Sequence, residues 1–131
     1  MQDLPASVVG IGVDIVDVQR FAGVLDRTPR FVERIFTADE SERSDGTRRN
    51  AQSLAARFAA KEAVAKVLVR THGLQWHHCE IISDDDGNPE LRLTGTVLQA
   101  AQALGIERWH LSLSHDGGHA IAYVVAEGTL R

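Results

Sequence analysis

Residues 54–69 have the sequence Leu-Ala-Ala-Arg-Phe-Ala-Ala-Lys-Glu-Ala-Val-Ala-Lys-Val-Leu-Val. The stretch is rich in alanine, leucine and lysine and contains no glycine or proline, which predicts a helix. At about 100° per residue, its apolar side chains fall on both sides of that helix. A helix that is apolar on both sides is usually buried in a core. The sequence therefore predicts a central helix on which the rest of the chain packs.

Charged residues nevertheless interrupt this helix, namely Arg57, Lys61, Glu62 and Lys66. Buried charge is costly unless it is paired, bound to a metal or used on a ligand. One interpretation is that the small alanine face packs closely on a sheet, so that the charged side chains lie at the edge of this contact and can act on a ligand. The alternative is an ordinary i,i+4 salt bridge from Glu62 to Lys66 on a solvated face. The helix alone leaves both interpretations open.

Length and composition limit the class of protein. A chain of 131 residues predicts a single domain, residues 1–131, with its own core. The net charge of −4 argues against a general nucleic-acid binder. The only cysteine, Cys79, excludes an internal disulfide and is typical of a reducing compartment. Because there is neither an apolar run of about 20 residues nor a secretory signal, we expect a cytoplasmic protein without a membrane partner.

The segment from Val8 to Val16 is predicted to be a strand because it is rich in β-branched residues. Its alternation places Gly10, Gly12 and Asp14 on one face. The two glycines leave room for a close approach to the Asp14 carboxylate. The alternatives are that Gly10-Ile-Gly12 marks a bulge or tight packing and that Asp14 caps the next helix. A dinucleotide-binding fingerprint is excluded because its third glycine is missing.

The remaining segments predict an α+β fold in which an antiparallel sheet packs against the long central helix. Asp17 should cap a first helix that Pro29 ends, and His72-Gly73 should end the central helix. Thr37 to Glu40 form a capping box. The other predicted elements are helices at 30–36 and 95–104, and strands at 76–83, 90–93, 108–115 and 120–126.

Three separated segments carry a family resemblance. They are Gly-Ile-Gly-Val-Asp-Ile-Val at 10–16, Arg-Phe-Ala-Ala-Lys-Glu-Ala at 57–63, and Leu-Ser-Leu-Ser-His at 111–115. Together with Lys66, they resemble the holo-[acyl-carrier-protein] synthases, a bacterial family of 4′-phosphopantetheinyl transferases. The resemblance runs from about residue 8 to residue 126, and the polar loop at 43–52 departs from the family pattern.

This resemblance implies transfer of 4′-phosphopantetheine from coenzyme A to a serine of an apo acyl carrier protein, with release of adenosine 3′,5′-bisphosphate. It implies Mg²⁺ held by Asp14 and Glu62, with Lys66 as a third catalytic residue beside the phosphate or the leaving group. The residues that it implies for coenzyme A binding are Arg57, Lys61, Lys66 and His115.

The resemblance also implies partners. An acidic acyl carrier protein, or the carrier domain of a fatty acid synthase, would dock on Arg20, Arg30 and Phe31. Family members form homotrimers with a site at each subunit boundary, so His115 would act on a neighbour's ligand. Two other hypotheses remain open here. One is a non-catalytic module that binds carrier proteins, and the other is a different Mg-dependent nucleotide phosphohydrolase.

Overall fold

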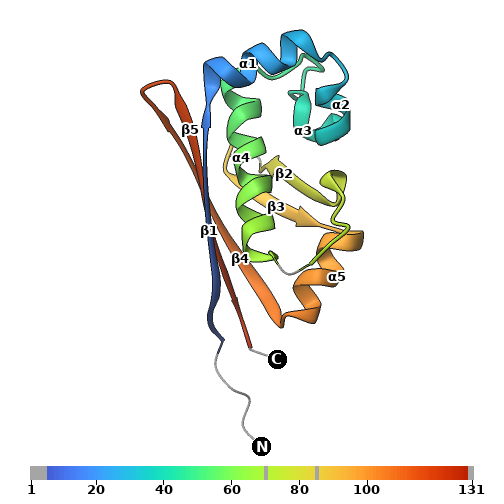
Figure 1. Cartoon of the computed structure of the whole chain (residues 1–131), viewed down its shortest axis with the longest axis vertical. Helices are drawn as coiled ribbons and strands as arrows, with labels where there is room; N and C mark the ends of the chain where they lie inside the picture. Colours follow the sequence, from blue (N-terminus) through green and yellow to red (C-terminus); the bar gives the residue numbers. More distant parts are fainter. Residues whose placement is uncertain (1–5, 70, 85, 130–131) are drawn as a thin grey trace, which may run out of the picture.

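A three-stranded antiparallel sheet and one long helix form the framework of the protein (Figure 1). The computed structural model describes residues 6–69, 71–84 and 86–129. The elements are β1 (Ser7–Asp17), α1 (Val18–Arg27), α2 (Phe31–Ile35), α3 (Ala38–Ser41), α4 (Ala51–Val67), the 3₁₀ helix η1 (Trp76–His78), β2 (Cys79–Ser83), β3 (Pro89–Leu93), α5 (Gly95–Ala103), β4 (Ile106–Asp116) and β5 (His119–Gly128).

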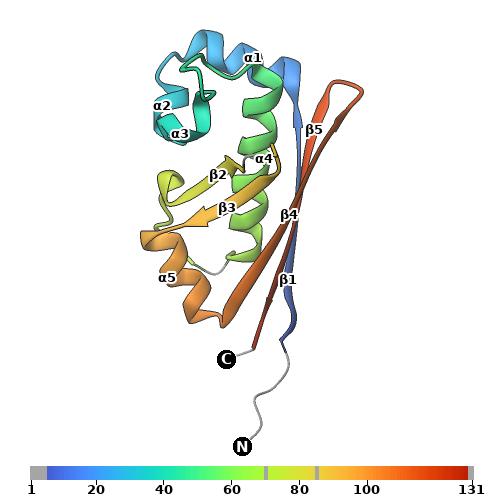
Figure 2. The same cartoon turned by 180° about the vertical axis from the view of Figure 1, so that it is seen from behind.

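The long sheet has the strand order β1-β5-β4, and β2 and β3 form a separate antiparallel pair. All the helices lie on one side of the long sheet, and the β2–β3 pair lies on that side as well (Figures 1 and 2). The predicted α+β class with an antiparallel sheet on a central helix is therefore confirmed. No helix in the part of the chain that the structure describes is long and apolar enough to cross a membrane.

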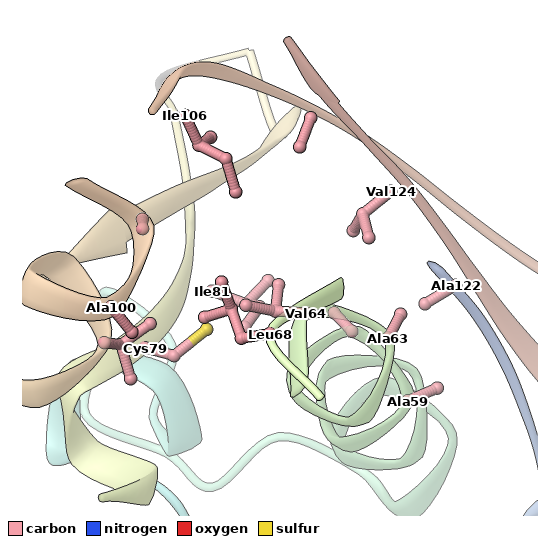
Figure 3. Packing of buried hydrophobic residues seen from close by; sticks show 14 residues of the cluster. Ala59, Ala63, Val64, Leu68, Cys79, Ile81, Ala100, Ile106, Ala122 and Val124 are labelled. Carbon is pink, nitrogen blue, oxygen red and sulfur yellow. The ribbon is translucent and has the colours of Figure 1, made fainter. Parts of the chain in front are cut away.

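Helix α4 packs on the sheet through small side chains. Ala59 and Ala63 are fully buried, as are Ala122 and Val124 on the facing side of β5 (Figure 3). On β1, a Cβ atom added to Gly12 would overlap the carbonyl oxygen of Ala63. The room that the glycines create is thus occupied by α4 itself, and the pairing of β1 with β5 also shifts register between Val8 and Gly10. Both the tight packing and the bulge that were considered for this motif are therefore present.

The residues that the structure describes leave the other face of the sheet uncovered. Ile11, Val13 and Ile15 of β1 are 56%, 48% and 60% exposed, and Tyr123 of β5 is 46% exposed. The alternation of β1 was predicted correctly, but alternation does not tell which face the helices cover. The structure places the apolar face of β1 outside and the glycine face inside.

Most helix ends follow the predicted caps. The Asp17 carboxylate accepts a hydrogen bond from the Arg20 amide at 2.9 Å, and the Thr37–Glu40 capping box is present. The central helix begins at Ala51, with Asn50 as its N-cap, and ends at Val67. The prediction that it continues to His72-Gly73 is wrong, because the chain leaves the helix at Leu68, whose side chain is fully buried in the core.

Candidate active site

The first group of functional side chains lies where β1 meets α4. Asp14 comes from the inward face of β1, and Lys66 lies in the last turn of α4. The Lys66 ammonium donates to the Asp14 carboxylate at 3.0 Å and to the Val13 carbonyl oxygen at 2.8 Å. The i,i+4 pair considered from the sequence is absent among the described residues, where the ion-pair partner of Lys66 is Asp14 rather than Glu62.

Glu62 lies beside this pair, one turn before Lys66. Burial raises the pKa of the Glu62 carboxyl above its usual 4.5, the negative charge of Asp14 raises it further, and Lys66 lowers it. Asp14 and Glu62 also line the same cavity, which has a volume of about 410 Å³. The two carboxylates that the sequence singled out are therefore brought together, and their mutual repulsion is what a bound cation would relieve.

The donor set of this cavity fits Mg²⁺. Mg²⁺ in enzymes is usually held by one or two carboxylates together with substrate phosphates and water. Within residues 6–69, 71–84 and 86–129, there is no cluster of three or more His, Cys, Asp or Glu side chains that could hold a metal. Asp14 and Glu62 thus suit an open site completed by a ligand better than a closed structural site.

An aromatic wall borders the same cavity. Phe58 of α4 lies 5.5 Å from Phe21 and 5.9 Å from Phe31 between ring centroids, and it stacks on Trp76 at 5.6 Å. Phe31, Phe58 and Arg20 all line the cavity with the two carboxylates. Arg30 precedes Phe31 as the exposed N-cap of α2. Two of the three residues expected to dock the carrier therefore line this cavity, and the third is adjacent in sequence.

Arg57 and His115 come together elsewhere, in a second cavity of about 280 Å³ that they line with Ser53. Arg57 is only 5% exposed, and burial, followed by the charge of Arg49, lowers its pKa to about 10. It donates to the Ser53 and Ser83 hydroxyls at 3.1 and 2.8 Å, while its Nε has no hydrogen-bond partner among the described residues. This arrangement leaves a buried donor available beside the cavity.

Among the described residues, the two cavities have no lining residue in common. Asp14 is on β1 and His115 is on β4, which are the opposite edges of the three-stranded sheet. Within one chain, the structure therefore does not bring His115 to the carboxylates.

Lys61, which was expected to bind coenzyme A, is buried and paired within the protein. Its side chain is 1% exposed, and its ammonium group donates to the Glu40 carboxylate at 2.9 Å, to the Trp76 carbonyl at 2.9 Å and to the Cys79 carbonyl. These contacts use all three of its N–H donors. The physical reason is that this turn of α4 faces α3 and β2 instead of solvent.

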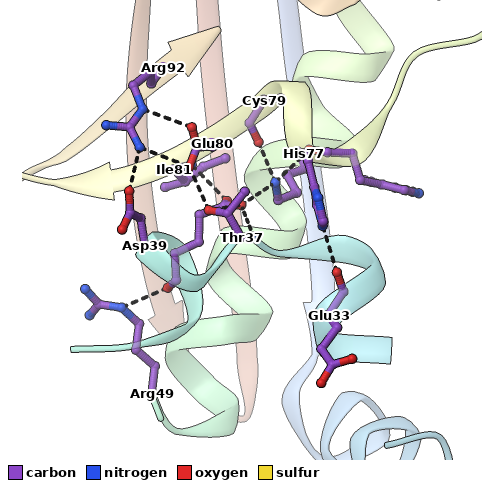
Figure 4. A network of polar contacts seen from close by, with 12 residues as sticks. Glu33, Thr37, Asp39, Arg49, His77, Cys79, Glu80, Ile81 and Arg92 are labelled. Atoms are coloured by element: carbon purple, nitrogen blue, oxygen red, sulfur yellow. Dashed lines mark hydrogen bonds and ion pairs between the residues drawn. The ribbon is translucent and has the colours of Figure 1, made fainter. Parts of the chain in front are cut away.

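Glu40 is the residue that the sequence analysis missed. It was expected only to close the capping box, and it does accept from the Thr37 amide at 3.0 Å. It is also fully buried, pairs with Lys61 and accepts from the Ile81 amide at 2.9 Å. Figure 4 shows the labelled residues Thr37, Cys79 and Ile81 of this network. The sequence offered only one signal, a glutamate in one predicted helix and a lysine in the next. That signal does not show that the two side chains form a buried pair.

Comparison with known proteins gives consistent results. The model of the 4′-phosphopantetheinyl transferase superfamily matches residues 10–124. The holo-[acyl-carrier-protein] synthase of Salinispora arenicola is 56% identical over 120 residues, which are 92% of this chain and 98% of that protein. That of Frankia casuarinae is 58% identical over 121 residues, with the same coverage. The structure described as the Chronobacterium ammoniagenes ACPS–CoA complex has a TM-score of 0.79 and 29% identity, covering 96% of this chain and 99% of that one.

Proposed function

The chain belongs to the 4′-phosphopantetheinyl transferase superfamily, and from this premise we propose that Asp14, Glu62 and Lys66 are its catalytic residues. The protein is a holo-[acyl-carrier-protein] synthase. It transfers 4′-phosphopantetheine from coenzyme A to a serine of apo acyl carrier protein. The serine hydroxyl gives up its proton to a base and its oxygen forms a bond to the phosphorus that carries pantetheine. The bond from that phosphorus to the bridging oxygen breaks, and adenosine 3′,5′-bisphosphate leaves.

The observation that carries the proposal is the meeting of two carboxylates in one cavity, with the pKa of Glu62 raised by burial and by Asp14. Asp14 and Glu62 would hold Mg²⁺ there, and the bound metal supplies positive charge for the phosphate oxygens. Lys66 is half-exposed and has one N–H donor left beyond its bonds to Asp14 and the Val13 carbonyl. It can therefore donate to a phosphate oxygen at the edge of this cavity.

The positively charged second cavity is proposed to bind the remaining phosphates of coenzyme A. Arg57 has a buried donor without a partner, and His115 lies across the same cavity. A phosphate oxygen would satisfy the Arg57 Nε and offset the desolvation of its guanidinium.

We propose that a homotrimer brings the two cavities together. The two cavities lie at opposite edges of the sheet, so a neighbouring chain can set its His115 against the Asp14 of the first. The uncovered side chains of Ile11, Val13 and Ile15 form an apolar surface that such an assembly would bury. Each complete site would then be built from two chains.

Mixing two inactive variants tests this shared site. Asp14→Asn and His115→Ala should each be inactive alone, because each variant lacks one half of every site. After the subunits are mixed and exchanged, about a quarter of the sites would combine an intact Asp14 with an intact His115. Activity that does not recover in the mixture, at a molecular mass that shows trimers, would mean that each site lies within one chain.

The carrier protein is proposed to dock over the first cavity. Arg20 lines that cavity, and Arg30 is exposed beside it, so both can pair with an acidic carrier. Phe31 supplies an apolar anchor next to them. We also propose a cytoplasmic location, since the single Cys79 fits a reducing compartment.

The decisive experiment is intact-mass measurement of an apo carrier protein after incubation with coenzyme A, with and without Mg²⁺. The expected result is a gain of one phosphopantetheine that requires Mg²⁺ and is lost in Asp14→Asn. A carrier that binds but gains no mass would support the binding module, and loss of coenzyme A without any carrier would support the phosphohydrolase.

A further inference from the structure

The pair formed by Glu40 and Lys61 is buried completely, with side-chain exposures of 0% and 1%. A buried ion pair is tolerated only when its geometry is good and its remaining donors and acceptors are satisfied. Both conditions hold here. Lys61 donates to Glu40 and to two backbone carbonyls, and Glu40 also accepts from two backbone amides.

This pair joins three parts of the fold at one point. Glu40 belongs to α3, Lys61 belongs to α4, and the Ile81 amide that binds Glu40 belongs to β2. Another contact at the same junction is the hydrogen bond from the Thr37 hydroxyl to the Glu80 carboxylate at 2.6 Å. Losing the pair would therefore loosen α3 and β2 from the helix that carries Glu62 and Lys66.

Two arginines are attached to this junction. The Arg49 Nε donates to the backbone carbonyl of Glu40 at 3.0 Å, and Arg57 donates to Ser83 at the end of β2 at 2.8 Å. Burial lowers the pKa of Arg57, and the positive charge of Arg49 lowers it further. The Arg57 Nε, which has no hydrogen-bond partner among the described residues, is the donor available to an anion, while Arg49 lines a separate cavity and adds only its positive charge.

We propose that Glu40 and Lys61 are positioning residues that, by holding β2 and Arg49 against α4, set the position of Arg57 and thereby the affinity for the phosphates of coenzyme A. Neither residue touches the ligand, because Glu40 and Lys61 are both enclosed by protein. The inference rests on the proposed role of Arg57 in phosphate binding.

The test compares Lys61→Met, Glu40→Gln and the double variant. The double variant removes both charges of the pair, so it leaves neither partner unpaired and serves if a single variant does not fold. Adenosine 3′,5′-bisphosphate binding is measured by calorimetry, and the KM values for coenzyme A and for the carrier are measured well below each melting temperature. Because small displacements of positioning groups can cost up to about a hundredfold, we expect each single variant to weaken bisphosphate binding about tenfold or more. The KM for the carrier should hardly change. The double variant should bind the bisphosphate no more weakly than either single variant.

Three results would overturn the proposal. If only Lys61→Met weakens binding and Glu40→Gln does not, Lys61 is a direct ligand. If the variants melt earlier but bind the bisphosphate normally, the pair has only a structural role. If Ile106→Ala, which removes a core side chain at the far end of β4, weakens binding equally, general loss of stability explains the effect.

Arg57→Ala separates this inference from the proposed function. If Arg57→Ala binds the bisphosphate normally, the phosphate site is elsewhere. The proposed phosphate-binding role of Arg57 and the positioning role of Glu40 and Lys61 then both fail. If Arg57→Ala loses binding while the Glu40 and Lys61 variants keep it, only the positioning role fails.

Discussion

Replacing Gly12 by alanine should separate β1 from α4. A Cβ atom at position 12 would overlap the carbonyl oxygen of Ala63 and lie 3.1 Å from a methyl group of Val124. The carbonyl belongs to the backbone of α4, and Val124 is fully buried, so neither can turn aside. The strand or the helix must therefore move, and Asp14 moves with the strand.

The expected cost follows from overpacking, which is typically about 1–3 kcal/mol. With an unfolding entropy of about 2.1 cal/mol/K per residue, a chain of 131 residues should lose about 4–11 °C in Tm for that cost. Since Asp14 lies two residues after Gly12, the shift also moves its carboxylate away from Glu62 and Lys66. We expect turnover at low temperature to fall about tenfold or more, because catalytic geometry tolerates little displacement.

Calorimetry and turnover at a temperature where every variant is folded measure the two effects separately. Gly23→Ala in α1 is the matched control, because its new Cβ would approach only the end of the Arg27 side chain, at 3.1 Å. Alanine inside a helix should leave Tm unchanged or raise it. Gly10→Ala should be intermediate, since it meets the side chain of Val67 at 2.7 Å. If Gly12→Ala melts and turns over like the wild type, the glycine does not set the distance between β1 and α4.

Four further predictions test the site. Glu62→Gln should lower Mg-dependent turnover about a hundredfold yet melt no earlier than the wild type at pH 7. The folded-state pKa of Glu62 is raised, so the ionised carboxylate destabilises the wild type once the pH exceeds the usual 4.5. Any gain in Tm of the Gln variant over the wild type should therefore shrink as the pH falls toward 4. Lys66→Ala should cost at most about 0.5 kcal/mol of stability but reduce turnover, and normal turnover would exclude a catalytic role. Arg20→Ala and Arg30→Ala should raise the KM for the carrier several-fold at low salt, with unchanged Tm and little effect on coenzyme A. Burial raises the pKa of the Cys79 thiol to about 12, so thiol reagents at pH 8 should label it only after unfolding.

Local signals predicted most of the fold. The cap at Asp17 and the capping box at Thr37 depend on neighbours within one turn, so the sequence contains all the information they need. The end of α4 depends on the burial of Leu68 in the core, which is a tertiary effect and was predicted wrongly. Segment 76–83 shows the same limitation, because its first three residues form the 3₁₀ helix η1 and only Cys79–Ser83 is a strand.

The site was predicted less completely, for a related reason. Asp14 and Glu62 were paired through family resemblance, and the structure brings them into one cavity. The charges on α4 could not be assigned to partners from helix periodicity, because those partners lie on β1 and α3. Lys66 reaches back to Asp14, and Lys61 enters the interior to meet Glu40. Periodicity describes one element at a time, whereas these pairs form between elements.

The strand order β1-β5-β4 also has a consequence for synthesis of the chain. Ser7 to Asp17 pair with residues 119–128, so the first described strand has no hydrogen-bonding partner until the last one leaves the ribosome. During that interval Ile11, Val13 and Ile15 belong to an unpaired, apolar, β-branched segment, which is the kind that associates with other chains. Such distant pairing also slows folding, since a loop of about a hundred residues must close first. The early nascent chain should therefore depend on chaperones more than its modest size suggests.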